Sequence, residues 1–212
     1  MYKDILKIEL EIENENEFRP TKQKRVRGSK KYEDIGYYEG ELVNDVPDGI
    51  GIFFFDDESK YSGQWKNGSM HGVGIFNFID GCIYEGNFYQ GLRDGYGIFK
   101  VPNNEMYEGY WKDDSFHGKG KYTYSDGSVY KGEWSLGQRN GYGEYIYEGG
   151  ESYIGNWEEG EKSGEGTYIF TDGAKFEGNF IKGKEEGHGE FIMNNGVRYE
   201  AKIMDGQIYI KK

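Results

Sequence analysis

The stretch DGSVYKGEW, residues 126–134, holds the pattern that decides the fold. An Asp-Gly dipeptide, which suits a tight turn, precedes Tyr130, Gly132 and Trp134 at every second position. Similar stretches are IDGCIYEGNF (79–88), TDGAKFEGNF (171–180) and, in altered form, NNGVRYEAKI (194–203). A short pattern that returns along one chain indicates a repeat protein.

The repeat has a constant length of 23 residues and contains no insertion. The aromatic residue that marks each unit is Tyr38, Tyr61, Tyr84, Tyr107, Tyr130, Tyr153, Phe176 and Tyr199. A glycine follows two residues later in the first seven units, and a Gly-x-Gly pair with two alternating large residues ends each of them. The internal period of two predicts strands, so each unit is expected to form a β-hairpin.

The composition shows how such hairpins could bury a core. The chain has 35 Gly, 20 Tyr, 13 Phe and 4 Trp, but only 35% of its residues are hydrophobic. Alternation places rings and glycines on one face, where a ring can fill the slot beside a glycine of the adjoining strand. One hairpin is marginal in water, but stacked hairpins cover each other. We therefore predict an all-β fold, an elongated single-layer antiparallel β-meander solenoid of about sixteen strands and roughly 80 Å.

The pattern divides the chain into three parts. Residues 1–31 form an N-terminal arm, 38–198 contain seven repeats, and 199–212 contain a partial eighth repeat with a C-terminal capping hairpin. The arm has an acidic alternating segment of charge −4 over 1–18 and a basic run of charge +7 over 19–31. Within the arm, a degenerate cap is expected to start at residue 26. Since the net charge is −12, the rest of the chain carries −15 (−12 + 4 − 7).

Several classes of function are disfavoured. An acidic body does not suit nucleic acid, because phosphate binding needs clustered cations. His71 and His117 stand two repeats apart, roughly 19 Å by strand spacing, too far to share a metal ion. Cys82 has no evident partner base, and the glycine pairs precede strands, whereas a phosphate loop precedes a helix. We expect no enzyme activity, no cofactor, no metal site and no nucleic-acid partner.

The single cysteine and the absence of an apolar leader or membrane-spanning run predict a cytoplasmic protein. This expectation leaves open a peripheral position on a membrane or on the cytoskeleton.

The stretches YEGNFYQGLRDGYGIF (84–99) and YKGEWSLGQRNGYGEY (130–145) resemble MORN repeats, named for the membrane occupation and recognition nexus. The resemblance covers 38–199 as seven units and a partial eighth. Asp45 and Asp114 replace the usual loop glycine, and Leu42 replaces an aromatic residue. The resemblance to MORN repeats implies a twisted sheet with a grooved face. It also implies a non-catalytic scaffold, as in radial spokes, cytoskeletal scaffolds and membrane-bridging junctophilins.

Most rings are expected to hold the sheet together, but those central in the array could also anchor a helix or an extended peptide of a partner. The candidate groove residues are Trp111, Tyr122, Tyr124, Trp134, Tyr145, Tyr147 and Trp157. The function expected first is a non-enzymatic protein-binding scaffold. Its setting in a cytoskeletal or ciliary assembly rests on the resemblance alone.

The basic arm leaves alternatives open. It could fold against the acidic repeats, contact the cytoskeleton, or bind acidic phospholipids and make the protein a peripheral membrane adaptor. The candidate residues are Lys22, Lys24, Arg25, Arg27, Lys30 and Lys31.

The face opposite the rings is apolar in the first three units. Its apolar residues are Ile50, Ile52, Phe54, Val73, Ile75, Tyr96 and Ile98. The N-terminal segment, another protein or a second copy could cover this patch. Homo-oligomers could form through it or through the sheet edges.

Overall fold

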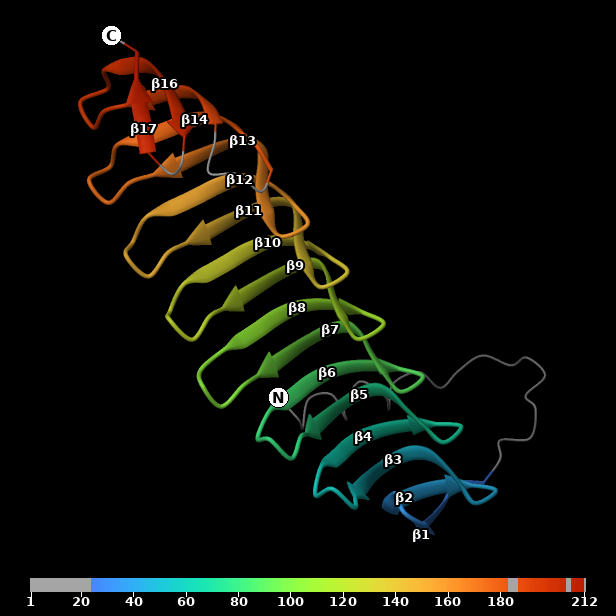
Figure 1. Ribbon diagram of the computed structural model, residues 1–212. Coiled ribbons are helices and arrows are strands. Elements are labelled where there is room, and N and C mark those ends of the chain that lie inside the picture. Colours follow the sequence, from blue (N-terminus) through green and yellow to red (C-terminus); the bar gives the residue numbers. More distant parts are fainter. Residues whose placement is uncertain (1–23, 183–186, 205–206, 212) are drawn as a thin grey trace, which may run out of the picture.

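The computed structural model describes residues 24–182, 187–204 and 207–211. These residues form one antiparallel sheet of seventeen strands, in which each strand pairs with the next along the chain (Figure 1). The predicted meander is therefore confirmed, with one strand more than the approximate count. Within the described residues, no helix has the length and apolarity that a membrane span requires.

The strands are β1 (Val26–Tyr32), β2 (Gly36–Val43), β3 (Val46–Phe55), β4 (Lys60–Lys66), β5 (Ser69–Asn77), β6 (Ile83–Tyr89), β7 (Leu92–Lys100), β8 (Met106–Lys112), β9 (Ser115–Thr123), β10 (Val129–Ser135), β11 (Gln138–Ile146), β12 (Ser152–Glu158), β13 (Glu161–Ile169), β14 (Lys175–Phe180), β15 (Gly187–Ile192), β16 (Arg198–Met204) and β17 (Gln207–Ile210).

The two strands of a repeat differ in length, and the difference is taken up by a bulge. In the third repeat Gly86 of β6 pairs with Gly97 of β7, but Phe88 pairs with Arg93, so β7 contains two extra residues. Bulges bend strands and increase their twist. The strands in Figure 1 curve accordingly as they cross the sheet.

The bulge leaves the Asn87 backbone without a ladder partner on β7, and the tyrosine of the same repeat supplies a partner for its carbonyl. The Tyr84 hydroxyl donates a hydrogen bond to the Asn87 carbonyl at 2.9 Å. The same bond, from the tyrosine to the carbonyl three residues later, occurs at Tyr38, Tyr61, Tyr107, Tyr130 and Tyr153. A buried carbonyl without a partner is costly, so this bond stabilises the bulge.

Glycines leave the space in which these rings lie. The tyrosine rings of the first six repeats and the Phe176 ring are fully buried. A Cβ atom added to Gly97 would lie 2.4 Å from the Tyr84 hydroxyl oxygen. The expectation that rings fill slots left by glycines of the adjoining strand is confirmed.

The tryptophans join successive repeats. The Trp111 ring packs edge-on against Tyr84 of the preceding repeat and Tyr107 of its own, with both centroid distances 5.2 Å. Its indole N–H donates to the Gly97 carbonyl at 3.4 Å. The tryptophans at 65, 134 and 157 donate equivalent bonds to the preceding repeat. Each repeat therefore completes the core of the one before it, as expected for stacked repeats.

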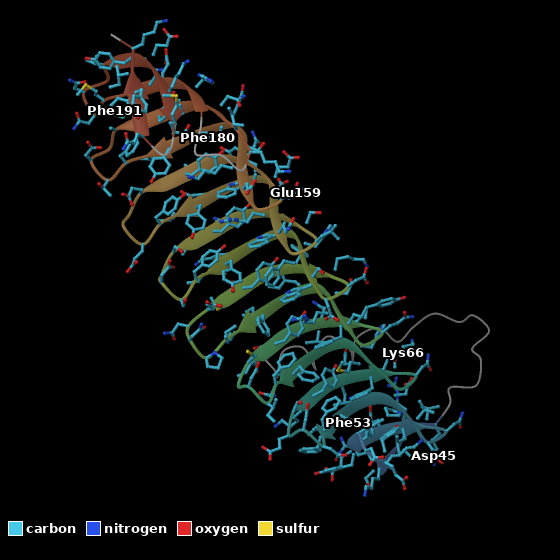
Figure 2. The ribbon with its side chains drawn as sticks, viewed as in Figure 1. Asp45, Phe53, Lys66, Glu159, Phe180 and Phe191 are labelled. Carbon is cyan, nitrogen blue, oxygen red and sulfur yellow. The ribbon has the colours of Figure 1, made fainter. Side chains whose placement is uncertain are left out.

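Two kinds of turn lie on opposite sides of the sheet. The short strand of a repeat joins the long strand through a two-residue turn with positive φ at both positions, as at Gln90 (50°) and Gly91 (90°). Asp114, with a φ of 64°, takes the place of glycine in one such turn. These values match the type I′ turns that suit twisted hairpins. Asp45, Lys66 and Glu159, which lie in or beside such turns, follow one long side of the sheet in Figure 2.

The Asp-Gly dipeptides occupy longer loops than expected. Gly81 has a positive φ of 84° but Asp80 does not, and the pair lies within the five residues 78–82 that join β5 to β6. The Asp80 carboxylate accepts the backbone N–H of Cys82 at 2.9 Å, and Gly81 N–H donates to the Phe78 carbonyl at 3.1 Å. Aspartate favours such loops because its side chain bonds the backbone two residues on.

The sheet ends in strands at both edges of its described part. β1 pairs with β2 in a register that sets Gly28 opposite Gly40, and the Tyr32 ring packs against Phe53 at 5.6 Å. At the other end β17 pairs with β16 and sets Ile208 opposite Ile203. Residues 26–32 thus extend the ring-bearing face by one strand.

Replacing Tyr84 with Phe should lower the free energy of unfolding by about 1–2 kcal/mol, because the Asn87 carbonyl loses its buried partner. Urea unfolding followed by circular dichroism measures the change. Tyr142→Phe is the control, since Tyr142 is exposed on the opposite face, and should change stability by less than about 0.5 kcal/mol. Equal effects of the two variants would contradict the bulge-stabilising role.

Gly97→Ala should destabilise the protein by about 3 kcal/mol, because the new methyl group overlaps the buried Tyr84 ring. Gly127→Ala is the matched control. Nothing lies within 4 Å of its added Cβ, and only its positive φ of 87° is strained, so about 1 kcal/mol is expected. Thermal unfolding of both variants tests this ordering, and a Gly127 variant that is the less stable of the two would refute it.

Candidate binding face

A second layer of rings covers the buried tyrosines and tryptophans on the same face of the sheet. We call it the ring row; it consists of Phe55, Phe76, Phe78, Phe99, Tyr122, Tyr124, Tyr145, Tyr147, Tyr168, Phe170 and Phe191. These rings come from the long strands and the residues just after them, and they are half-buried. Neighbouring rings along the row have centroids 4.4–6.0 Å apart, except between Phe99 and Tyr122, where Val101 interrupts it.

The predicted groove residues separate into two layers. Trp111, Trp134 and Trp157 are only 4%, 6% and 4% exposed and belong to the core. The four predicted tyrosines lie in the ring row, where part of each ring remains accessible: Tyr122, Tyr124, Tyr145 and Tyr147. All seven residues share one face, but the tyrosines are the ones that a partner could contact. Their role in binding stays a prediction.

Burial raises the pKa of several tyrosines in the ring row. Burial, followed by a hydrogen bond to Glu105, raises the pKa of Tyr122 to about 12. The Tyr122 hydroxyl donates to the Glu105 carboxylate at 3.1 Å. Burial is also the main cause that raises the pKa of Tyr124 and Tyr147. These groups therefore offer neutral O–H donors across the physiological pH range.

A hollow lies at the β1 end of the ring row. Its volume is 340 Å³. Its larger lining side chains are Tyr32, Ile35, Pro47, Phe53, Phe55, Trp65 and Met70. Apolar lining of this kind suits a large apolar side chain of a partner.

Cations beside the ring row were not predicted. The Arg93 guanidinium lies 4.2 Å from the Trp111 ring centroid, and that of Arg139 lies 4.4 Å from the Trp157 centroid. Lys162 Nζ lies 4.9 Å from the Tyr168 centroid. All three occupy the first ring-side position of a long strand, which the alternation from the Gly-x-Gly pair would have identified.

Two cations of the basic arm contact the turn between β2 and β3 or the start of β3. Arg25 Nη2 lies 2.9 Å from the Asp48 carboxylate, and Lys30 Nζ donates to the Asp45 carbonyl at 2.8 Å. Of the other predicted residues, Lys24, Arg27 and Lys31 are exposed. Lys22 lies outside the described residues.

The face opposite the ring row exposes apolar side chains, as predicted. Ile50, Val73 and Tyr96 are 48%, 36% and 44% exposed. Ile52, Phe54, Ile75 and Ile98 are half-buried. The described residues do not show a partner for this patch.

Within the described ranges, no group of three His, Cys, Asp or Glu residues is placed to hold a metal ion. His71 packs against Tyr89 with centroids 5.4 Å apart, and His117 pairs with Tyr110 across β8 and β9. Cys82 is buried, and burial raises the pKa of its thiol.

Alkaline pH should destabilise the fold. Burial raises the pKa of Tyr38 and Tyr122 to about 12, whereas an unfolded tyrosine ionises near pH 10. Above pH 10 the unfolded chain therefore releases protons that the folded chain retains, so the free energy of unfolding falls as the pH rises from 10 toward 12. Urea unfolding across this range measures the slope. Tyr122→Phe should reduce the slope by the equivalent of nearly one proton released on unfolding. An unchanged slope would refute the raised pKa of Tyr122.

The chain matches the MORN repeat family over seven consecutive segments, residues 38–60, 61–83, 84–106, 107–129, 130–152, 153–175 and 176–198. No curated protein sequence matches the chain. The family match covers the repeats that carry the ring row.

Two solved structures are similar to this chain. One is the TCP domain of Drosophila melanogaster SAS-4 (dCPAP) in complex with a proline-rich motif of Ana2 (dSTIL). It has a TM-score of 0.48 and 12% identity, over 93% of this chain and 98% of that chain. The other is a mutant TCP10 domain of Danio rerio CPAP, with a TM-score of 0.42 and 11% identity, over 74% of this chain and 73% of that chain.

Proposed function

The chain belongs to the MORN repeat family, and from this premise we propose that it is a non-enzymatic scaffold that binds a helix or an extended peptide of a partner protein along the ring row. The nearly continuous row of half-buried rings carries this proposal. Tyrosine and phenylalanine offer large contact areas with few rotatable bonds, and a buried aromatic anchor often contributes much of an interface's binding energy.

The layer beneath the ring row supports the same function. Tyr145 rests on Trp157 with a centroid distance of 6.1 Å, and Trp157 is itself fixed by its bond to the Gly143 carbonyl. Rings that are already held in place lose little conformational freedom when a partner binds. The core thus prepares the ring row for binding.

We place the scaffold in the cytoplasm, within a cytoskeletal or ciliary assembly. The support for this setting is the use of MORN repeats as scaffolds in such assemblies. The chain itself contributes an elongated sheet along which a partner can be held (Figure 1).

The alternative, a membrane adaptor that uses the basic arm, has less support. Arg25 faces Asp48, and Lys30 binds the Asp45 carbonyl. Both side chains would have to give up these contacts to meet a lipid headgroup. Lys24, Arg27 and Lys31 remain exposed, and a few cations add about 1 kcal/mol each at an anionic surface.

Affinity capture from the source cell tests the proposal. The double variant Tyr124→Ser, Tyr147→Ser removes two rings of the ring row, and partner capture should fall at least tenfold. The control is Tyr110→Ser, Tyr142→Ser on the opposite face, where the side chains are 53% and 58% exposed. Circular dichroism and thermal unfolding verify that both variants fold. Capture that depends on the control pair and not on the ring row would overturn the proposal.

Vesicle flotation distinguishes the membrane adaptor from the protein-binding scaffold. The full chain should not float with phosphatidylserine vesicles at physiological salt. Flotation that disappears at high salt and in the variant Lys24→Glu, Arg27→Glu, Lys31→Glu would support the membrane adaptor, provided that the ring-row variant still floats.

A further inference from the structure

The first ring-side position of the long strand is Arg93 in the third repeat and Arg139 in the fifth. The charges of these two guanidinium groups are balanced differently. In the third repeat, Arg93 Nε lies 2.8 Å from the Asp114 carboxylate, and Arg93 Nη2 donates to the Asp114 carbonyl at 3.1 Å. Asp114 is the second residue of the turn in the next repeat. The Arg93 charge is thus neutralised within the protein.

Arg139 occupies the same position two repeats later, but its turn residue is Gly160. Arg139 Nη2 donates to the Gly160 carbonyl at 2.6 Å, and in the described part of the chain no carboxylate pairs with its guanidinium. This turn lies on the side of the sheet marked by Glu159 in Figure 2. Among the described residues, one guanidinium on the ring-bearing face is therefore without a counter-charge.

The rings fix the position of this charge. The Arg139 guanidinium lies 4.4 Å from the Trp157 centroid, 5.3 Å from Tyr145 and 5.8 Å from Tyr130. Such contacts hold an arginine in place while leaving its other N–H groups able to donate. A fixed guanidinium binds a carboxylate with two parallel hydrogen bonds.

The hydroxyl groups of the ring row are concentrated around Arg139. The row is phenylalanine in the first three repeats and tyrosine at 122, 124, 145, 147 and 168. Tyr145 shares a hydrogen bond with Ser128 at 2.9 Å, whereas no residue in the described ranges bonds the hydroxyls of Tyr124 and Tyr147. This half of the row offers donors and positive charge, and the other half offers apolar rings.

We propose that the occupant of the ring row is an amphipathic segment of a partner protein that places an Asp or Glu carboxylate against Arg139 and a large apolar side chain in the hollow at the β1 end. This inference rests on the proposed function and adds the chemistry and direction of the partner. From β3 to β11 is eight strand spacings, roughly 38 Å. The two groups of the partner are therefore about twelve residues apart if it is extended and about twenty-five if it is helical.

The probe is a phage-displayed library of random thirty-residue peptides, selected on the full chain. Enriched peptides should carry an acidic residue and a large apolar residue at one of these separations. A synthetic fluorescent copy of the most enriched peptide then gives dissociation constants by fluorescence anisotropy. A library that enriches no acidic residue overturns the inference.

The key variant is Gly160→Asp, which recreates beside Arg139 the carboxylate that Asp114 provides for Arg93. Gly160 has a φ of 87°, and Asp114 adopts a φ of 64° at the equivalent position, so aspartate is sterically acceptable. Binding of the acidic peptide should weaken at least tenfold, and Arg139→Gln should have a similar effect. Neither variant should change the affinity of a peptide whose acidic residue is replaced by its amide. Arg93→Gln is the control and should change affinity less than twofold.

The variants also separate the two proposals. Loss of peptide binding in Tyr124→Ser, Tyr147→Ser with no change in Gly160→Asp and Arg139→Gln would overturn the carboxylate site and leave the scaffold function standing. Binding unaffected by the ring-row variant would overturn both. A Gly160→Asp effect on phosphatidylserine vesicles but not on the peptide would replace the acidic peptide with a lipid.

Discussion

The contact of a buried tyrosine ring with a pair of glycines is the constraint on which the rest of the structure depends. The Tyr84 ring lies where a Cβ on Gly97 would be, and its hydroxyl bonds the Asn87 carbonyl that the bulge leaves unpaired. One residue thus fills the core and satisfies the backbone. Because the contact is local to one hairpin, it can be repeated along the chain without a large apolar interior.

This arrangement sorts side chains of similar chemistry into different roles. Tryptophans lie in the core and link each repeat to the one before it, whereas the tyrosines that follow the Gly-x-Gly pairs form an accessible second layer. A rigid lower layer and a half-exposed upper layer together make a surface suited to binding. Since the upper rings contribute less to the core, they can change from phenylalanine to tyrosine along the sheet and alter its polarity without altering the fold.

The same separation explains which parts of the candidate site could be predicted. The face on which Trp157 and Tyr147 lie follows from the period of two, which is local information. Their different exposure depends on how rings of adjoining repeats overlap, and no local pattern contains that. Arg139 could have been placed on the ring face by counting from Gly141, but the loss of its counter-charge became evident only beside Arg93 and Asp114.

The sequence by itself determined the hairpin, its 23-residue period, the ring-bearing face and the number of complete repeats, because strand alternation and turn residues act over a few positions. The tertiary structure alone decided the bulge, the two types of turn and the contacts between residues 21 positions apart, such as Arg93 with Asp114. The physical reason is that a register shift moves one strand against its neighbour. Which groups then meet depends on how successive repeats stack, and not on the residues of either strand alone.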